Sequence, residues 1–275
     1  VKALQQSFGR TKAGGLDDFK KVMELRTNSS NNTVFADDKG NIAYWHGNFM
    51  PRRDPKFDYE KPVDGSNPAT DWNGLHEVDE TVHVYNPGEG WIQNCNATPF
   101  TVSGASSPDP KKYPFYMAPD PENPRGLHAV KVLKDEYNFT LEKLIGAAFD
   151  PYLPGFEILL PPLLKGFDNV AASNDTLKKN YDEPIQLLRK WDMKWAAGSV
   201  PTTLAIAWAS RLRANVAKRL PEASNQLEVI HYLAEKTSDQ EKASALAGAM
   251  AELKRDFGSW KQAWGAINRF QRLNA

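Results

Sequence analysis

The stretch Asn32-Thr-Val-Phe-Ala-Asp-Asp-Lys-Gly-Asn-Ile-Ala-Tyr-Trp-His46 predicts a β-hairpin near the start of the chain. Both of its ends are rich in residues that favour strands, and the Asp37–Asn41 segment between them has the composition of a turn. Gly40 stands in that turn, where a positive φ is often required and glycine adopts it without steric cost. We therefore expect two short antiparallel strands.

A helix is expected immediately before this hairpin, over residues 15–27. Apolar side chains recur there at nearly helical spacing, at Leu16, Phe19, Val22, Met23 and Leu25. We expect this helix to pack on one face of the hairpin. The hairpin side chains that we expect to be largely buried are Val34, Ile42 and Tyr44.

Long loops are expected over residues 50–125, because most of the 19 prolines lie in this range or just after it. Frequent aromatic residues in the same range argue against disorder, which is poor in them. One run, Trp91–Cys95, has the composition of a strand, and the Asn86–Gly90 segment before it has that of a turn.

The chain from about residue 139 onward is expected to be helical. One expected helix is capped by Thr140 and ends at about Phe149, and a second is capped by Asp175 and interrupted by Pro184. A third covers Thr202–Lys218, with Pro201 in its first turn. A fourth begins at the capping box Ser238–Glu241 and ends at about Phe257. The expected class is thus α+β. Residues 1–135 hold strands and long loops, and residues 136–275 are helical.

Composition excludes several functional classes. The chain has 275 residues, and Lys plus Arg equals Asp plus Glu at 34 each, so no positive excess favours a nucleic-acid partner. A single cysteine excludes an internal disulfide and a multi-cysteine metal site. No apolar run approaches the roughly 18 residues that a membrane span requires. Because the sequence opens on Val1-Lys-Ala-Leu, without Met or a signal-peptide pattern, we expect an internal stretch of a longer chain.

No self-contained catalytic motif is present. GxSxG, HExxH, P-loop and GxGxxG patterns are absent, and the five histidines have no metal-ligand spacing, which favours structural or surface roles for them. The densest uncharged polar cluster is Gln93–Thr98, in which strand alternation would place Asn94 and Asn96 on one face. An asparagine amide there could donate to a developing oxyanion, or it could hold a loop; the residues alone favour the loop.

An ordered series of segments resembles the penicillin acylase family. The string Phe35–Tyr44 is similar to a hairpin of that family with the pattern YADxxGNIGY. Further similar segments follow in the family's order: His46–Arg53, Asp54-Pro55, Pro62–Gly65, Asp71–Gly74, Asn86–Asn96 and Pro99. The helical zone is similar more weakly. The resemblance covers nearly the whole chain and identifies it as a C-terminal-side part of the family's large subunit.

The resemblance implies an N-terminal-nucleophile hydrolase with an αββα core, of which residues 1–135 would form part. In that class a precursor cuts itself, and the freed N-terminal Ser attacks an amide with its own α-amino group as the base. The implied substrates are small-molecule acylated amines such as β-lactams, N-acyl-homoserine lactones or lipopeptides. The implied location is the bacterial periplasm or the exterior of the cell.

The resemblance implies roles for several residues of this chain. Asn96 matches the family's oxyanion donor, and Arg125 matches an arginine that orients this asparagine and faces the substrate. Asn94 is expected to support the loop. Phe8 and Asn31 fall where the family has walls of the acyl pocket, and Asn31 would make that pocket more polar.

A calcium ion is also implied in the full-length protein, with Pro55 as one ligand through its backbone carbonyl. The ion is not expected to be required for the chemistry.

The chain departs from the family where the nucleophile should stand, since it begins with Val1 and not Ser. The small subunit and the preceding part of the large subunit are therefore its expected partners, and the fragment alone is expected to be inactive. The alternative is a non-catalytic relative that binds a ligand or shapes a cell-surface protein. A Ser, Thr or Cys at the start of the mature large subunit would favour the enzyme.

Overall fold

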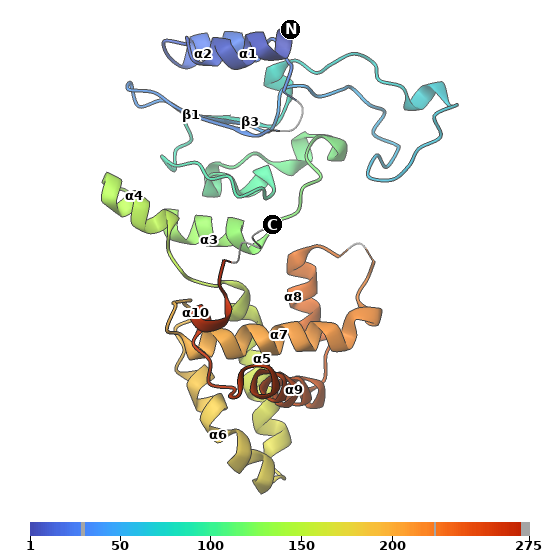
Figure 1. Ribbon diagram of the computed structural model, residues 1–275. Coiled ribbons are helices and arrows are strands. Elements are labelled where there is room, and N and C mark those ends of the chain that lie inside the picture. Colours follow the sequence, from blue (N-terminus) through green and yellow to red (C-terminus); the bar gives the residue numbers. More distant parts are fainter. Residues whose placement is uncertain (29–30, 223, 271–275) are drawn as a thin grey trace, which may run out of the picture. The chain divides into compact units, whose positions relative to one another are not determined.

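A computed structural model describes residues 1–28, 31–222 and 224–270. Contacts divide the chain into two units, Val1–Ala148 and Phe149–Ala275 (Figure 1). The sequence placed the division between residues 135 and 136, so the two divisions differ in where they assign the helix α4 (Leu141–Ala148). No helix among the described residues combines the length and the apolarity that crossing a bilayer requires.

The first unit opens with two helices and a three-stranded antiparallel sheet. Its elements are α1 (Lys2–Arg10), α2 (Leu16–Met23), β1 (Thr33–Ala36), β2 (Ile42–Trp45) and β3 (His83–Tyr85), in the sheet order β1-β2-β3. The hairpin prediction is confirmed. The Asp37 carboxylate accepts the N–H groups of Lys39 at 3.0 Å and Asn41 at 2.9 Å, and Gly40 has a φ of 82°.

Helix α2 packs on one face of this sheet, as expected. The Phe19 ring lies 4.8 Å from that of Phe35 and 5.5 Å from that of Trp45, between ring centroids. Met23 and Trp45 are fully buried in this layer. The aromatic contacts join the helix to both strands of the hairpin.

The opposite face of the sheet is only partly covered. Tyr44 and Val84 are buried against Val102, whereas Ile42 is half-buried. The prediction that Val34 is buried is wrong, because its side chain is 55% exposed. Val34 belongs to the edge strand β1, and Val102, which covers Tyr44, packs against β2 and β3.

Long loops and short 3-10 helices fill the rest of the first unit, as the prolines indicate. The Asn86–Gly90 turn is confirmed, with the Gly90 N–H donating to the Pro87 carbonyl at 3.0 Å. The predicted strand at Trp91–Cys95 is wrong, because this segment has no regular secondary structure and does not pair in the sheet. The short elements are η1 (Pro68–Thr70), η2 (Val78–Glu80), η3 (Pro99–Thr101), η4 (Gly104–Ser106), η5 (Pro110–Lys112) and η6 (Phe115–Met117).

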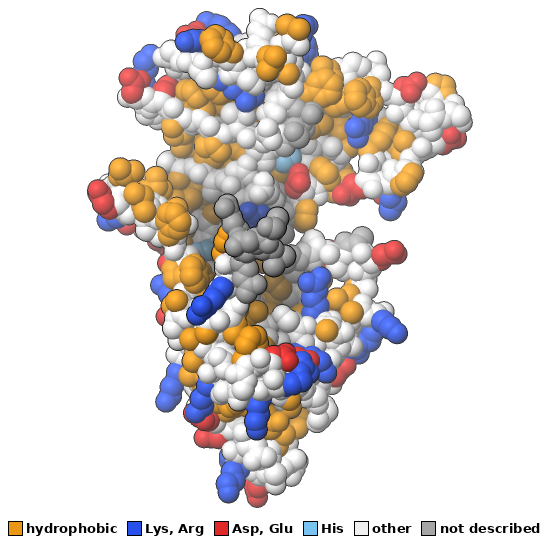
Figure 2. Space-filling model, in the orientation of Figure 1, with side chains coloured by type: hydrophobic (Ala, Val, Ile, Leu, Met, Phe, Trp, Pro, Cys, Tyr) orange, Lys and Arg blue, Asp and Glu red, His pale blue; other side chains and the backbone are white. Residues whose placement is uncertain are grey.

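Two α-helices, α3 (Pro124–Leu133) and α4, close the first unit. The predicted cap of α4 is confirmed, since the Lys143 N–H donates to the Thr140 hydroxyl at 3.3 Å. Apolar side chains along α4 are largely exposed, and Figure 2 shows them in orange at the left of the view.

The second unit is helical, as predicted. Its elements are α5 (Gly155–Ala171), α6 (Asp175–Arg189), α7 (Val200–Val216), η7 (Ala217–Arg219), α8 (Gln226–Glu235), α9 (Asp239–Phe257) and α10 (Trp264–Ile267). Helix α7 packs on α9, and α5 packs on α8 and α9. The core of this unit includes the buried side chains of Leu163, Leu204, Trp208 and Leu246.

The ends of these helices follow the sequence signals closely. The capping box of Ser238 and Glu241 opens α9, and Pro201 stands in the first turn of α7. Helix α6 differs in two respects: Asn174 and not Asp175 is its cap, and the predicted interruption at Pro184 is wrong because the helix continues through it. The core position of Pro184, beside the buried Ile185, offsets the lost backbone hydrogen bond.

Candidate active site

Asn96 lies in a tight turn that follows the Trp91–Cys95 segment. Its φ of +52° is in the left-handed region, which asparagine tolerates better than most residues. The Asn94 side chain accepts the Asn96 N–H at 2.9 Å and so stabilises this turn. The turn, rather than the alternation of a strand, therefore sets the direction of the Asn96 side chain, and Asn94 supports it.

Arg125, on the first turn of α3, holds the Asn96 side chain. Its Nη1 and Nη2 both lie 3.3 Å from Asn96 Oδ1. A guanidinium only donates, so the atom that it contacts must be the amide oxygen and not the nitrogen. The Nδ2 donor is thereby turned away from Arg125.

Asn123 joins the Asn96 turn to helix α3. Its Oδ1 accepts the Gly126 N–H at 3.0 Å and caps the helix, while its Nδ2 donates to the carbonyls of Cys95 at 3.2 Å and Asn96 at 3.0 Å. Asn123 was not predicted to be a site residue. The available signal was the pair Asn123-Pro124, a preferred cap followed by proline at the first helical position.

Gly126 allows α3 to approach the turn closely. A Cβ at this position would lie 2.8 Å from Ala97 Cβ and 2.2 Å from Glu122 Oε1. The first turn of α3 therefore fits against the chain that follows Asn96 only because residue 126 has no side chain.

A cavity of about 540 Å³ opens beside Asn96. Its walls mix aromatic, charged and polar groups, and include His46, Phe49, Arg53, Trp72, Tyr116 and Asp120. Phe8 and Asn31 do not line it: Phe8 is 67% exposed on α1, and Asn31 is exposed next to Asn32, which does line the cavity. Their roles in an acyl pocket stay predictions.

His46 connects two other polar groups at this cavity. Its Nε2 lies 3.0 Å from Asp120 Oδ2, and its Nδ1 lies 2.9 Å from the Tyr44 hydroxyl. The hydrogen bond to His46 is the main cause that lowers the pKa of Asp120. Burial, and then the charge of Asp120, raise the pKa of Tyr44.

Tyr44 is therefore protonated and Asp120 ionised near neutral pH. In the neutral His46 ring, the Nε2–H donates to the carboxylate and Nδ1 accepts from Tyr44. The sequence analysis assigned His46 a structural or surface role, and its spacing carried no signal for this contact.

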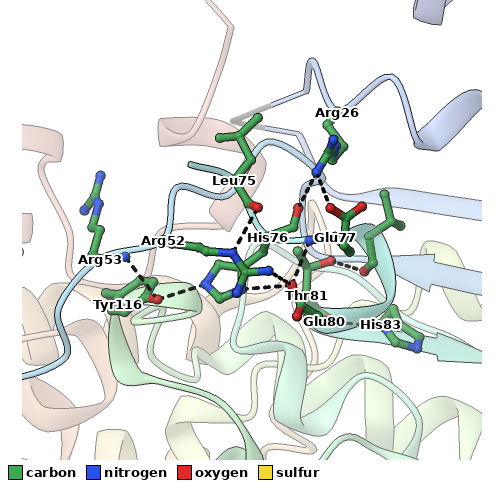
Figure 3. A network of polar contacts seen from close by, with 11 residues as sticks. Arg26, Arg52, Arg53, Leu75, His76, Glu77, Glu80, Thr81, His83 and Tyr116 are labelled. Carbon is green, nitrogen blue, oxygen red and sulfur yellow. Dashed lines mark hydrogen bonds and ion pairs between the residues drawn. The ribbon is translucent and has the colours of Figure 1, made fainter. Parts of the chain in front are cut away.

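A second polar network holds Tyr116, which lines the same cavity (Figure 3). The Tyr116 hydroxyl lies 2.9 Å from His76 Nε2 and accepts the Arg53 backbone N–H at 3.3 Å. Glu80 Oε2 lies 3.4 Å from His76 Nδ1 and 2.5 Å from Arg52 Nη2. Residues distant in sequence thus hold the phenol of Tyr116 in place.

The residues around Pro55 do not form a calcium site by themselves. The neighbouring carboxylates are engaged by lysines, with Asp54 at 2.8 Å from Lys56 and Asp58 at 2.8 Å from Lys61. In the described ranges of the chain, no group of three or more His, Cys, Asp or Glu side chains could hold a metal ion. Calcium binding by Pro55 stays a prediction.

Cys95 is not set up as a nucleophile. The half-buried thiol has its pKa raised, chiefly by desolvation, and the nucleophilic form of a cysteine is the thiolate. The cavity is therefore lined by hydrogen-bond donors, charged side chains and apolar side chains, and Cys95 adds no activated nucleophile.

An α+β unit that presents an oriented amide donor at a cavity has the geometry that hydrolases use to stabilise an oxyanion. Residues 1–275 match the family model described as Penicillin amidase, and the chain belongs to this family. Penicillin G acylase of Escherichia coli is 40% identical over 68 residues, which are 25% of this chain and 8% of that protein.

A solved structure, the thermostable penicillin G acylase from Alcaligenes faecalis, has the same fold. It superimposes with a TM-score of 0.68 at 19% identity, over 94% of this chain and 52% of that one. The likeness confirms the α+β fold expected from the sequence. The chain thus spans about half the length of that acylase.

Proposed function

We propose that the protein containing this chain is an acylase, which hydrolyses the amide of a small acylated amine to a carboxylate and an amine. One observation carries the proposal: Arg125 holds the oxygen of the Asn96 amide at 3.3 Å, beside a cavity of about 540 Å³. Membership of the Penicillin amidase family supports it.

In the proposed reaction, an N-terminal Ser outside this chain attacks the carbonyl carbon while its α-amine takes the hydroxyl proton. The Asn96 Nδ2–H donates to the resulting oxyanion, and the positive charge of Arg125 polarises that amide. Collapse breaks the C–N bond and passes the proton to the leaving amine. Water then cleaves the acyl-enzyme ester and restores the Ser.

The proposal extends to the rest of the protein. It includes self-cleavage of a precursor, a small subunit and a preceding part of the large subunit as partners, and a periplasmic or secreted location. It also includes a calcium ion held jointly by Pro55 and residues outside this chain. The penicillin G named for the relatives, N-acyl-homoserine lactones and lipopeptides are the candidate substrates.

Asn96→Ala in the full-length protein tests the proposal. Loss of an oxyanion donor should lower kcat about 10²–10³-fold, or about 3–4 kcal/mol, while KM changes little. Arg125→Ala should lower kcat less than Asn96→Ala does, because Arg125 acts on the oxyanion through Asn96. It should change KM more, because Arg125 is expected to face the substrate. Each variant is first checked for correct subunit processing, since an unprocessed precursor would also be inactive.

An Asn96→Ala enzyme that is processed and keeps the wild-type kcat would show that Asn96 merely holds a loop. The non-catalytic alternative predicts something different. The mature large subunit would then begin with a residue other than Ser, Thr or Cys, and no amide of a broad panel would be cleaved.

A further inference from the structure

Arg53 stands where two cavities meet. The cavity of about 540 Å³ beside Asn96 and a second one of about 490 Å³ share Arg53, Tyr116 and Pro119 in their walls. The second cavity is rich in aromatic rings, including Phe57, Tyr59 and Phe115. A side chain in this position can contact a ligand in either cavity.

The Arg53 guanidinium lies near two aromatic rings and has no anionic partner among the residues that the structure describes. Its Cζ lies 4.9 Å from the Tyr59 ring centroid and 5.9 Å from that of Trp72. Its buried Nε has no hydrogen-bond partner, and within the described part of the chain no carboxylate forms an ion pair with it. The buried hydroxyl of Tyr59 is also without a partner.

The neighbouring Arg52 is a matched contrast. It donates from Nε to the Leu75 carbonyl at 3.2 Å and from Nη2 to Glu80 at 2.5 Å. Figure 3 shows that the Arg53 side chain points away from this network, which it joins only through its backbone N–H. The fold therefore satisfies one of two adjacent guanidinium groups and leaves the buried Nε of the other without an acceptor among the described residues.

Nearby acidic groups do not fill this gap. Among the residues that line the two cavities, Asp120 is paired with His46 at 3.0 Å and Asp58 with Lys61 at 2.8 Å. A further cavity lined by Arg53 also has Asp54, which pairs with Lys56 at 2.8 Å, and Asp71 in its walls. Glu60 and Asp71 are exposed, and no ion pair joins either of them to Arg53. Arg10 also has a buried unpartnered Nε, but it lines neither cavity.

We propose that Arg53 is an anion-binding residue, which selects acylated amines that carry a carboxylate. A guanidinium matches a carboxylate through parallel N–H···O bonds, and leaving its buried nitrogen unpaired is unfavourable. The rings of Trp72 and Tyr59 lie within cation–π distance of the guanidinium and offer apolar surface to the remainder of the ligand. The inference rests on the proposed function, since it treats the cavity of Asn96 as the substrate site.

The test uses the processed full-length enzyme and three amides that differ only in a carboxylate: none, one on the amine ring, and one on the acyl chain. Binding is measured by calorimetry and hydrolysis by release of a chromogenic aniline. At least one carboxylated amide should bind about tenfold or more tightly than the neutral one, as expected for a hydrogen-bonded charge.

Arg53→Gln should abolish this preference by weakening the binding of the carboxylated amide more than that of the neutral one, and Arg53→Lys should restore part of it. Arg52→Gln removes the same charge one residue away and is the control. It should keep the preference and lower the thermal stability, because it leaves Glu80 without its arginine.

Three results would overturn the proposal: equal affinity for all three amides, an unchanged preference in Arg53→Gln, or an equal loss for neutral and charged amides in that variant. The last result, with a lowered melting temperature, would mean that an acid from another part of the protein pairs with Arg53. Binding preference without hydrolysis would instead contradict the proposed function and leave the anion site intact.

Discussion

Asn123→Asp separates the two tasks of one side chain. Aspartate caps a helix as well as asparagine does, so the bond from the Gly126 N–H to Oδ1 is expected to persist. It cannot donate, however, so the bonds to the Cys95 and Asn96 carbonyls, now 3.2 and 3.0 Å long, are lost. A carboxylate oxygen would instead face two carbonyl oxygens.

The magnitude follows from those two bonds. Each contributes about 0.5–1.5 kcal/mol, so about 1–3 kcal/mol that holds the Asn96 turn in its left-handed conformation disappears. If Asn96 is the oxyanion donor, its misplacement should lower kcat by about 5–150-fold, since about 1.4 kcal/mol is a factor of ten. The loss should not exceed that of Asn96→Ala.

The assay is steady-state kinetics on the processed full-length enzyme, together with thermal melting. Asn123→Ser is the matched control, because it also caps α3 and cannot reach both carbonyls, but it adds no charge. A fall in kcat with a nearly constant KM in both variants is expected. If processed Asn123→Asp retained the kcat of the wild type, the link between this side chain and the aim of Asn96 would be refuted.

Three further predictions address the fold and the fragment. Gly126→Ala should lower the stability by about 1–3 kcal/mol, because its Cβ overlaps Ala97 and Glu122; an unchanged melting temperature would contradict this close approach. The pKa of Asp120 is lowered in the folded protein, so this carboxylate stabilises the fold fully above about pH 4, and the stabilisation is lost as the pH falls through the folded pKa. Asp120→Asn should therefore make the free energy of unfolding depend less on pH at acid pH. Val1–Ala275 expressed alone should not hydrolyse a chromogenic amide, and turnover by the purified fragment would show that it contains its own nucleophile.

Local signals predicted the fold where the structure depends on neighbours in sequence. The Asp37–Asn41 turn and the capping box at Ser238 are satisfied by atoms a few residues apart, so both could be identified from the residues. Strand pairing depends on distant partners. β3 (His83–Tyr85) pairs with β2 across the middle loops, whereas the strand-like Trp91–Cys95 finds no partner strand among the described residues.

The helical unit shows the limit of reading proline as a stop signal. Pro184 lies inside α6, and α5 continues through Pro161 and Pro162. Each proline removes a backbone hydrogen bond, but both helices bury several large side chains in one core. Tertiary burial outweighs the local rule here, and no pattern in the sequence measures that burial.

The site was predictable in part. Asn96 and Arg125 were singled out through the family resemblance, and the structure brings their side chains together. The approach of His46 to Asp120 could not be inferred, because it depends on the path of a long loop. Nor could the sequence distinguish Arg53 from Arg52, since adjacent identical residues differ only in what surrounds them.

One chemical rule explains both the aimed amide and the free charge. A guanidinium donates and never accepts, so each arginine requires acceptors from somewhere. Arg125 finds the Asn96 oxygen, and the fold of this chain thereby sets the donor direction of that amide before any substrate arrives; a donor already in place needs no reorganisation when charge develops. Arg53 finds no acceptor among the described residues, although it lies near two aromatic rings at a cavity wall. Under the proposed function, Arg125 therefore serves the reaction through Asn96, and a ligand should supply the oxygen atoms that Arg53 lacks.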